Sequence, residues 1–203
     1  MKMKREPKQE QKLTPGEQCY VLLHDLVYIL AIVTLIFVFA LRVVSVDGDS
    51  MYPTLVHTDR MALLSNVFLN EENLERGDII VTIAPNFTDD PIVKRVIATP
   101  GQTVDIDFDK GIVYVDGVAL EEDYINEPTT RQFYDQGTQL PLTVDEGHVF
   151  VLGDNRNHSS DSRVGDIGQI DMENILGKVV FILLPGHDAE IGRTDFSRVG
   201  FVK

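Results

Sequence analysis

The stretch Pro91-Ile-Val-Lys-Arg-Val-Ile97 indicates the fold class, because it is rich in β-branched residues and has the length of one strand. Side chains alternate between the two faces of a strand, so Lys94 shares a face with Ile92 and Val96 while Arg95 points to the other. Other strand-length apolar runs, bounded by Gly, Pro, Asp and Asn, are Arg60–Ser65, Asp78–Ile83, Val149–Leu152 and Lys178–Leu184. Together they predict a body that is mainly antiparallel β.

A longer apolar run lies near the amino end. Leu26 to Leu41 carries no charged residue, and Tyr20–Leu23 and Val43–Val46 extend it toward the roughly 20 residues that a membrane-spanning helix needs. A cleavable secretory signal is the alternative, but its apolar part usually has about 7 to 15 residues and ends in an A-x-A-like site. Val38-Phe39-Ala40 has no small residue at its first position. We therefore expect a retained transmembrane anchor helix over residues 20–45.

Charge is distributed unevenly around this anchor. The chain has a net charge of −14, yet Lys and Arg are concentrated in the polar tail that precedes the anchor. Because positive residues favour the cytoplasmic side, we expect residues 1–19 to form a disordered cytoplasmic tail and residues 46–203 an extracellular body. The acidic body argues against a nucleic-acid partner. Cys19 is the single cysteine, so no intrachain disulfide can form.

The segment from about residue 104 to residue 147 has two parts. In Val104–Gly117, Asp residues at alternate positions resemble the start of a calcium loop, but the glycine falls one place too late for that motif. The same residues alternate polar and apolar around Asp-Lys-Gly111, which favours a hairpin with one wet face. The polar stretch Glu121–Gly147 predicts a lid, an extended loop or a small appended sheet.

Two side chains in different parts of the chain suggest a nucleophile and a base. Ser50 lies in Val46-Asp-Gly-Asp-Ser-Met-Tyr-Pro-Thr-Leu55, where Gly48 frees the backbone and Pro53 restricts it. A serine hydroxyl attacks poorly unless a neighbouring base accepts its proton. Lys94 is one candidate base, because apolar neighbours on its strand face would exclude water and lower its pKa.

From the residues alone, other interpretations of this pair remain open. Most strand lysines extend the ammonium group to water and pair with a carboxylate. A histidine can also activate a serine, although no recognisable Ser-His-Asp motif is present. The five histidines of the chain are His24, His57, His148, His158 and His187.

A third polar cluster, Gly153-Asp-Asn-Arg-Asn-His-Ser-Ser-Asp-Ser-Arg-Val-Gly165, follows an apolar strand. By itself, it fits a solvated turn or, less well, a metal loop. Together with Ser50-Met-Tyr-Pro-Thr54, Arg76-Gly-Asp78 and Lys94-Arg95, however, it resembles the ordered motifs of bacterial type I signal peptidases (leader peptidases). The resemblance runs from the anchor to about Leu184, and the residues around Ser50 are similar to those of Gram-positive members.

This resemblance implies a fold and a set of catalytic roles. The fold would be the signal peptidase/repressor-protease-like complex β fold, mainly antiparallel, with one N-terminal transmembrane helix. Ser50 would be the nucleophile and Lys94, neutral at rest, the general base, while Ser159 would orient the lysine amine. The residues that match structural supports of the family's site are Arg95, Asp154, Asp161 and Arg163.

Further expectations follow from the same resemblance. Gly48 stands where some relatives have a serine that helps to bind the oxyanion, so the Ser50 backbone amide is the expected donor. Asp161 and Arg163 are expected to form a charge-assisted pair. A Ser/Lys pair needs no metal and no organic cofactor.

The resemblance also implies partners and a location. Substrates would be signal peptides of exported preproteins, with small residues at the first and third positions before the cut, and the enzyme would contact the lipid bilayer and transiently the export machinery. Catalysis would take place on the outer face of the cell membrane. Two alternatives are a self-cleaving repressor-type Ser/Lys protease, which the anchor and the acidic body disfavour, and a membrane-anchored β module without activity.

Overall fold

The computed structural model describes residues 14–70, 73–133 and 137–202, and the chain divides into two compact units, Met1–Phe39 and Ala40–Lys203. The disorder expected for the amino-terminal tail concerns residues 1–13, which lie outside the described residues. Of the expected tail, residues 15–19 are helical instead.

The first unit contains one helix, α1 (Pro15–Phe39), within its described residues. The helix is long and apolar enough to cross a membrane, since its 25 residues span about 37 Å at 1.5 Å per residue. It begins five residues earlier than expected, because Thr14 and Glu17 form a reciprocal cap: the Thr14 N–H donates to Glu17 Oε2 at 2.7 Å and the Glu17 N–H to Thr14 Oγ1 at 3.4 Å.

The carboxyl end of the expected anchor is also corrected, because residues 41–45 are a strand and not helix. This strand, β1 (Leu41–Ser45), pairs antiparallel with β2 (Arg60–Ser65), with Leu41 opposite Leu64 and Ser45 opposite Arg60. Val43 and Val44 are β-branched and suit a strand, and pairing with β2 satisfies backbone groups that a longer helix would have used internally.

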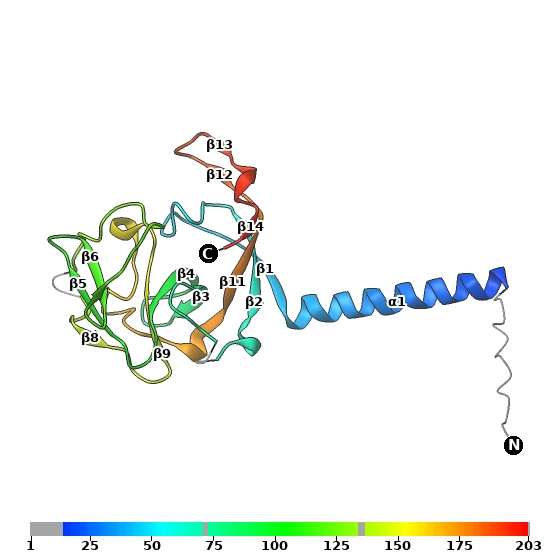
Figure 1. The fold of residues 1–203 in the computed structure, drawn as a ribbon, viewed down its shortest axis with the longest axis horizontal. Helices are drawn as coiled ribbons and strands as arrows, with labels where there is room; N and C mark the ends of the chain where they lie inside the picture. Colours follow the sequence, from blue (N-terminus) through cyan, green and yellow to red (C-terminus); the bar gives the residue numbers. More distant parts are fainter. Residues whose placement is uncertain (1–13, 71–72, 134–136, 203) are drawn as a thin grey trace, which may run out of the picture. The chain divides into compact units, whose positions relative to one another are not determined.

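The second unit is built on an eight-stranded antiparallel sheet in the order β1-β2-β11-β3-β4-β9-β10, with β14 paired to β11 (Figure 1). All five strand-length runs noted in the sequence lie in this sheet, which confirms the mainly antiparallel β fold. Its remaining strands are β3 (Ile79–Ala84), β4 (Thr88–Ala98), β9 (His148–Leu152), β10 (Ile170–Asp171), β11 (Ile175–Leu184) and β14 (Gly200–Phe201).

Residues 103–143 contribute a separate four-stranded sheet, in the order β7-β6-β5-β8. Its strands are β5 (Thr103–Asp107), β6 (Ile112–Val115), β7 (Val118–Ala119) and β8 (Leu142–Thr143). The expected hairpin is present, since Asp105 lies opposite Tyr114 and Asp107 opposite Ile112. Asp107 accepts hydrogen bonds from the backbone and side chain of Lys110, so its carboxylate closes the hairpin turn.

The smaller elements complete this unit. A two-stranded hairpin, β12 (His187–Asp188) with β13 (Arg193–Thr194), follows β11 and lies away from the four-stranded sheet (Figure 1). Short 3-10 helices are η1 (Asn66–Phe68), η2 (Arg156–His158), η3 (Met172–Asn174) and η4 (Phe196–Arg198).

Apolar side chains form three buried clusters that position the functional segments. One cluster joins Met51 and Leu55 to residues of β2, β3 and β11. A second buries Val96 of β4 with Val149 and Val151 of β9. The third lies between the two sheets and includes Phe150, which is fully buried. The turn that carries Ser50 and the strand that carries Lys94 are thus fixed to a packed core on both sides.

Candidate active site

The turn that carries Ser50 is held by apolar anchors and backbone hydrogen bonds. Met51 and Leu55 are buried, and the Leu55 N–H donates to the Met51 carbonyl at 2.9 Å. Gly48 has φ of 87°, a backbone conformation that favours glycine. The Ser50 carbonyl accepts a hydrogen bond of 3.0 Å from the Asn155 N–H, which ties the turn to the third polar cluster. Ser50 itself is half-buried.

Lys94 reaches Ser50 from the middle of the main sheet. It lies on β4, opposite Ile80 of β3, and only 3% of the residue is exposed. Its Nζ atom lies 2.9 Å from Ser50 Oγ and donates to the Val93 carbonyl at 2.8 Å. The alternative in which Lys94 extends to water does not occur, since the amine is enclosed beside the serine hydroxyl.

Burial changes the acid–base behaviour of this lysine. Loss of solvent lowers the pKa of Lys94 from 10.5 to about 8, against the opposing influence of the carboxylates Asp161 and Asp154, which favour the charged ammonium. A substantial fraction of the amines is therefore neutral at mildly alkaline pH. A neutral amine can accept a proton from Ser50, which an ammonium group cannot do.

Ser159 lies in the same buried region. It is only 1% exposed, and its hydroxyl finds no hydrogen-bond partner among the residues that the structure describes. A Cβ atom added to Gly153 would collide with both the Ser159 hydroxyl and the Ser50 carbonyl oxygen. The expected hydrogen bond between Ser159 and the Lys94 amine is not formed in this structure, but Gly153 brings Ser159 and the Ser50 backbone into close approach.

Asp161 and Arg163 form the expected ion pair. Arg163 donates from Nε to Asp161 Oδ1 at 2.8 Å and from a terminal nitrogen to Oδ2 at 2.9 Å, and both residues are buried. Burial alone would raise the pKa of Asp161, but Arg163 and the Gly153 N–H, which donates at 3.0 Å, hold that pKa below its usual value. The pair thereby fixes the backbone at Gly153, next to Ser159 and Ser50.

A second buried pair joins the remaining sequence motifs. Arg95 donates to both carboxylate oxygens of Asp154, at 2.8 and 2.7 Å, and to the carbonyl of Gly77 in the Arg-Gly-Asp motif at 2.8 Å. The hydroxyl of Thr54, at the end of the Ser50 motif, donates to the same Asp154 carboxylate. Four motifs that are distant in the sequence thus meet around one guanidinium group.

Three residues that the sequence did not reveal strengthen this region. Arg156 is fully buried and binds both carboxylate oxygens of Glu122, at 2.9 and 2.6 Å. The ring of Tyr124 lies against the Arg95 guanidinium, 4.0 Å from its centroid. Glu122 and Tyr124 belong to the polar segment that we expected to be a lid or loop. The sequence does place Arg156 in the third polar cluster. A single sequence, however, does not show which carboxylate pairs with it.

The histidine alternative gains no support from the geometry. No hydrogen bond within the described residues joins Ser50 to a histidine. His57 is used differently, since its Nδ1 atom accepts a 3.1 Å hydrogen bond from the Gly48 N–H and lies 3.4 Å from an Asp47 oxygen. The Gly48 N–H is therefore occupied by the His57 side chain.

Comparison with known proteins shows which family the chain belongs to. Residues 20–184 match the family described as signal peptidase, peptidase S26. The chain belongs to this family. It is 40% identical over 148 residues to a probable signal peptidase I-1 from Synechocystis, covering 69% of each chain, and 37% identical over 163 residues to signal peptidase I S from Bacillus subtilis, covering 77% of this chain and 83% of that protein.

A crystal structure of a signal peptidase I from Enterococcus faecalis is 34% identical, with a TM-score of 0.44, and covers 52% of this chain and 96% of that one. Membership of the signal peptidase family makes the chain a peptidase that acts on signal peptides, and its apolar helix α1 makes it a membrane-anchored protein. The matched residues end at Leu184, so β12, β13 and β14 lie beyond them.

Proposed function

We propose that this chain removes signal peptides from exported preproteins with Ser50 as nucleophile and Lys94 as general base. The observation that carries the proposal is the 2.9 Å contact between Lys94 Nζ and Ser50 Oγ in a water-poor environment. It combines the two requirements for a Ser/Lys pair: hydrogen-bond reach and a base with a lowered pKa, here about 8.

The proposed reaction follows the geometry. The neutral Lys94 amine takes the Ser50 proton as Oγ attacks the scissile carbonyl, and the resulting ammonium then protonates the leaving amine. Water, activated by Lys94 in turn, hydrolyses the acyl-serine and regenerates the enzyme. No metal and no organic cofactor takes part in these steps. The Ser50 N–H is the proposed oxyanion donor, supported by the absence of another acceptor for it within the described residues.

The buried hydroxyl of Ser159 is proposed to orient the Lys94 amine. An unpaired hydroxyl inside a protein is costly, and a third hydrogen bond to the amine would satisfy it. A small rotation of the lysine side chain during the reaction could supply that bond. Asp154 with Arg95 and Asp161 with Arg163 are proposed as structural supports that hold the backbone on either side of Ser159.

The proposed topology places residues before α1 in the cytoplasm and residues 46–203 outside the cell membrane. Lys-rich residues before an anchor favour this orientation. Only 11 positions separate Ser50 from Phe39, the last residue of α1, so the chain connection keeps the nucleophile within reach of the membrane surface. Substrates are proposed to carry small residues at the first and third positions before the cut, and to be delivered by the export machinery.

The decisive test uses purified full-length protein in detergent with a preprotein whose signal ends in an A-x-A site. Ser50→Ala and Lys94→Ala should each reduce kcat by at least roughly a thousandfold, since members of a catalytic unit fail together. Lys110→Ala is the matched control, because Lys110 is exposed in the β5–β6 turn. Mass spectrometry identifies the cut. Cleavage by both mutants at the wild-type rate would reject the Ser/Lys pair and favour a non-enzymatic β module.

A further inference from the structure

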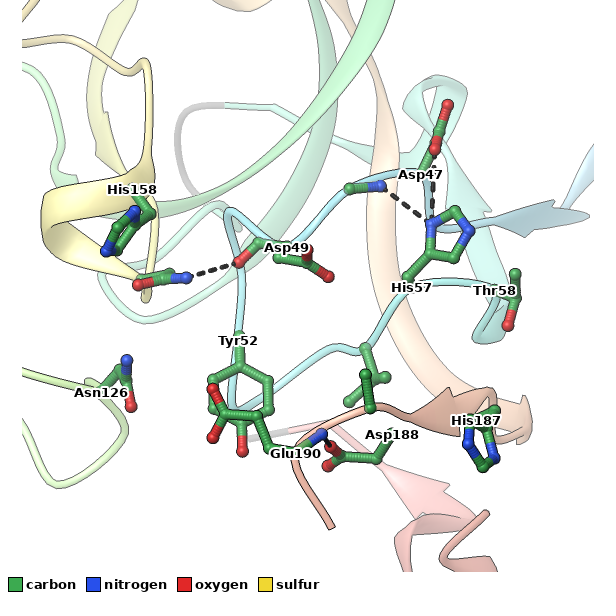
Figure 2. A pocket seen from close by; sticks show the side chains of 14 residues that line it. Asp47, Asp49, Tyr52, His57, Thr58, Asn126, His158, His187, Asp188 and Glu190 are labelled. Atoms are coloured by element: carbon green, nitrogen blue, oxygen red, sulfur yellow. Dashed lines mark hydrogen bonds and ion pairs between the residues drawn. The ribbon is translucent and has the colours of Figure 1, made fainter. Parts of the chain in front are cut away.

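A cavity of about 980 Å³ lies beside the turn that carries Ser50. Four segments line it: the turn itself, Asn126, Asn155 with His158, and the β12–β13 hairpin (Figure 2). In Figure 2, Asn126 and His158 lie on one side, and Asp188 and Glu190 of the hairpin lie on another. The cavity has the size of a ligand site that holds several residues of a peptide.

The described lining of this cavity contains carboxylates and imidazoles but no Lys or Arg. Its carboxylates come from Asp47, Asp49, Asp188 and Glu190, and its imidazoles from His57, His158 and His187. The four carboxylates, with no Lys or Arg beside them in the lining, give the cavity a negative character. The charge is accessible, since the Asp47 side chain is 98% exposed and Glu190 is exposed as well. A cationic segment of a partner would therefore be attracted to it.

The cavity is joined directly to the nucleophile. Asp49 precedes Ser50 in the chain, and the Asp49 carbonyl accepts a hydrogen bond of 3.1 Å from the Asn155 side-chain amide. The Asn155 backbone N–H binds the Ser50 carbonyl. Asn155 is 93% buried within the cavity lining, and its Oδ1 atom has no hydrogen-bond partner among the described residues. This unused acceptor points to a donor group that a bound ligand brings.

One wall of the cavity lies outside the residues that match the family. His187, Asp188 and Glu190 follow the last matched residue, Leu184. A hydrogen bond to Glu190 raises the pKa of Tyr52 to about 12, so the hairpin contacts the nucleophile turn through a phenol that stays protonated. The hairpin is also rigidified by Asp188, whose carboxylate accepts from the backbone of Glu190 at 2.9 Å.

We propose that this cavity binds the first residues of the mature protein, immediately after the cut, and favours a Lys or Arg among them. The inference rests on the proposed function. The first and third residues before the cut are small and uncharged, and a large acidic cavity suits neither their size nor their lack of charge. The segment after the cut has no such restriction, and a cationic side chain there would meet Asp47 and Glu190 while its donors reach Asn155.

The experiment compares preproteins that differ only at the second residue after the cut, which is Lys, Gln or Glu. Wild-type kcat/KM should fall in that order, with roughly a three- to tenfold difference between Lys and Glu, as expected for two exposed carboxylates. The double variant Asp47→Asn/Glu190→Gln should remove this difference, and the readout is the ratio of kcat/KM for the Lys substrate to that for the Glu substrate. Glu121→Gln, an exposed carboxylate outside the cavity, is the matched control and should keep the wild-type order.

Added salt should reduce the wild-type preference, because the carboxylates concerned are accessible to ions. The inference is overturned if the double variant keeps the preference for Lys. It is also overturned if substrate charge affects kcat/KM only when the exchanged residue lies before the cut. In both cases the Gln substrate would still be cleaved in a Ser50-dependent way, so the proposed function would stand. Absence of that cleavage in the wild type would instead overturn the proposed function and the inference with it.

Discussion

The Nζ atom of Lys94 lies 2.9 Å from the Oγ atom of Ser50, although 44 positions separate the two residues in the chain. The amine is enclosed by the sheet, and it also donates a hydrogen bond to the Val93 carbonyl. This enclosure explains both why the lysine can act as a base and why it is costly to keep charged.

Activity should rise with pH through the pKa of Lys94. The pKa is lowered from 10.5 to about 8, and the neutral amine accepts the Ser50 proton, so kcat/KM should increase about tenfold per pH unit below 8 and level off above it. Initial rates of preprotein cleavage from pH 6 to 9.5 measure this profile. A rate that is independent of pH over this range would exclude Lys94 as the titrating base.

Replacement of Lys94 by Met should stabilise the fold near pH 7. The unfolded lysine holds its proton up to about pH 10.4 and the folded one only to about 8, so the unfolded state binds more protons between these values and wild-type stability rises with pH there. Below pH 8, burial of the charged ammonium group lowers the free energy of unfolding by its full amount, about 3 kcal/mol at 1.36 kcal/mol per pKa unit.

Thermal melts of Lys94→Met and wild type, compared at pH 7 and pH 9.5, test this expectation. The stabilisation by Met should shrink at the higher pH, whereas Lys110→Met, at an exposed site, should show no such trend. An equal difference at both pH values would mean that the ammonium group is not penalised by burial.

Gly153→Ala should slow cleavage by about a hundredfold. The added Cβ would displace the Ser50 carbonyl and the Ser159 hydroxyl, so the nucleophile and the lysine would lose their alignment. A displacement of about 1 Å costs on the order of a hundredfold in rate. Gly16→Ala, where no atom lies within 4 Å, is the control and should cleave normally. A Gly153→Ala enzyme with wild-type kcat would show that this close approach is not needed.

Ser159→Ala should separate catalysis from stability. The Ser159 hydroxyl is buried without a partner, so its removal should leave the melting temperature unchanged or slightly higher. If the hydroxyl orients the Lys94 amine during turnover, kcat should fall by about 10- to 1000-fold and the rate should change its pH dependence. Loss of stability without a change in kcat would indicate a purely structural residue.

The Asp161–Arg163 pair should behave as a unit in unfolding experiments. Removing one partner leaves a buried charge uncompensated, so Asp161→Leu or Arg163→Met should each cost about 3 to 5 kcal/mol. The double variant should be less destabilised than the sum of both, because neither charge then remains. Denaturant titrations of the four proteins complete the cycle, and strictly additive costs would show that the two side chains do not interact.

Much of the fold was predictable, because local patterns carry it. Short runs of β-branched residues, such as the run around Val96, indicate strands wherever they occur. The transmembrane helix was equally clear from its apolar length, but its ends were not. The start depends on the Thr14–Glu17 cap, and the end depends on pairing of Leu41–Ser45 with β2, which local hydropathy does not reveal.

The candidate site was predictable only as a set of residue types in a known order. The sequence did not show that Arg95 pairs with Asp154, or that Arg156 and Glu122 form a second buried pair. These partners are far apart in the chain, and an acidic sequence offers many carboxylates to each guanidinium. Whether Ser159 forms a hydrogen bond with Lys94 likewise depends on side-chain positions, which a sequence motif does not specify.

The sequence by itself determined the class of fold, the presence of an apolar anchor and the chemical identity of Ser50 and Lys94, since periodicity and residue type are local properties. Only the tertiary structure decided that the two side chains meet, because it folds the Ser50 turn against β4 and removes water from the amine. The same packing formed the acidic cavity from four separate segments. Burial and proximity depend on the whole fold, and burial lowers the pKa of Lys94 to about 8.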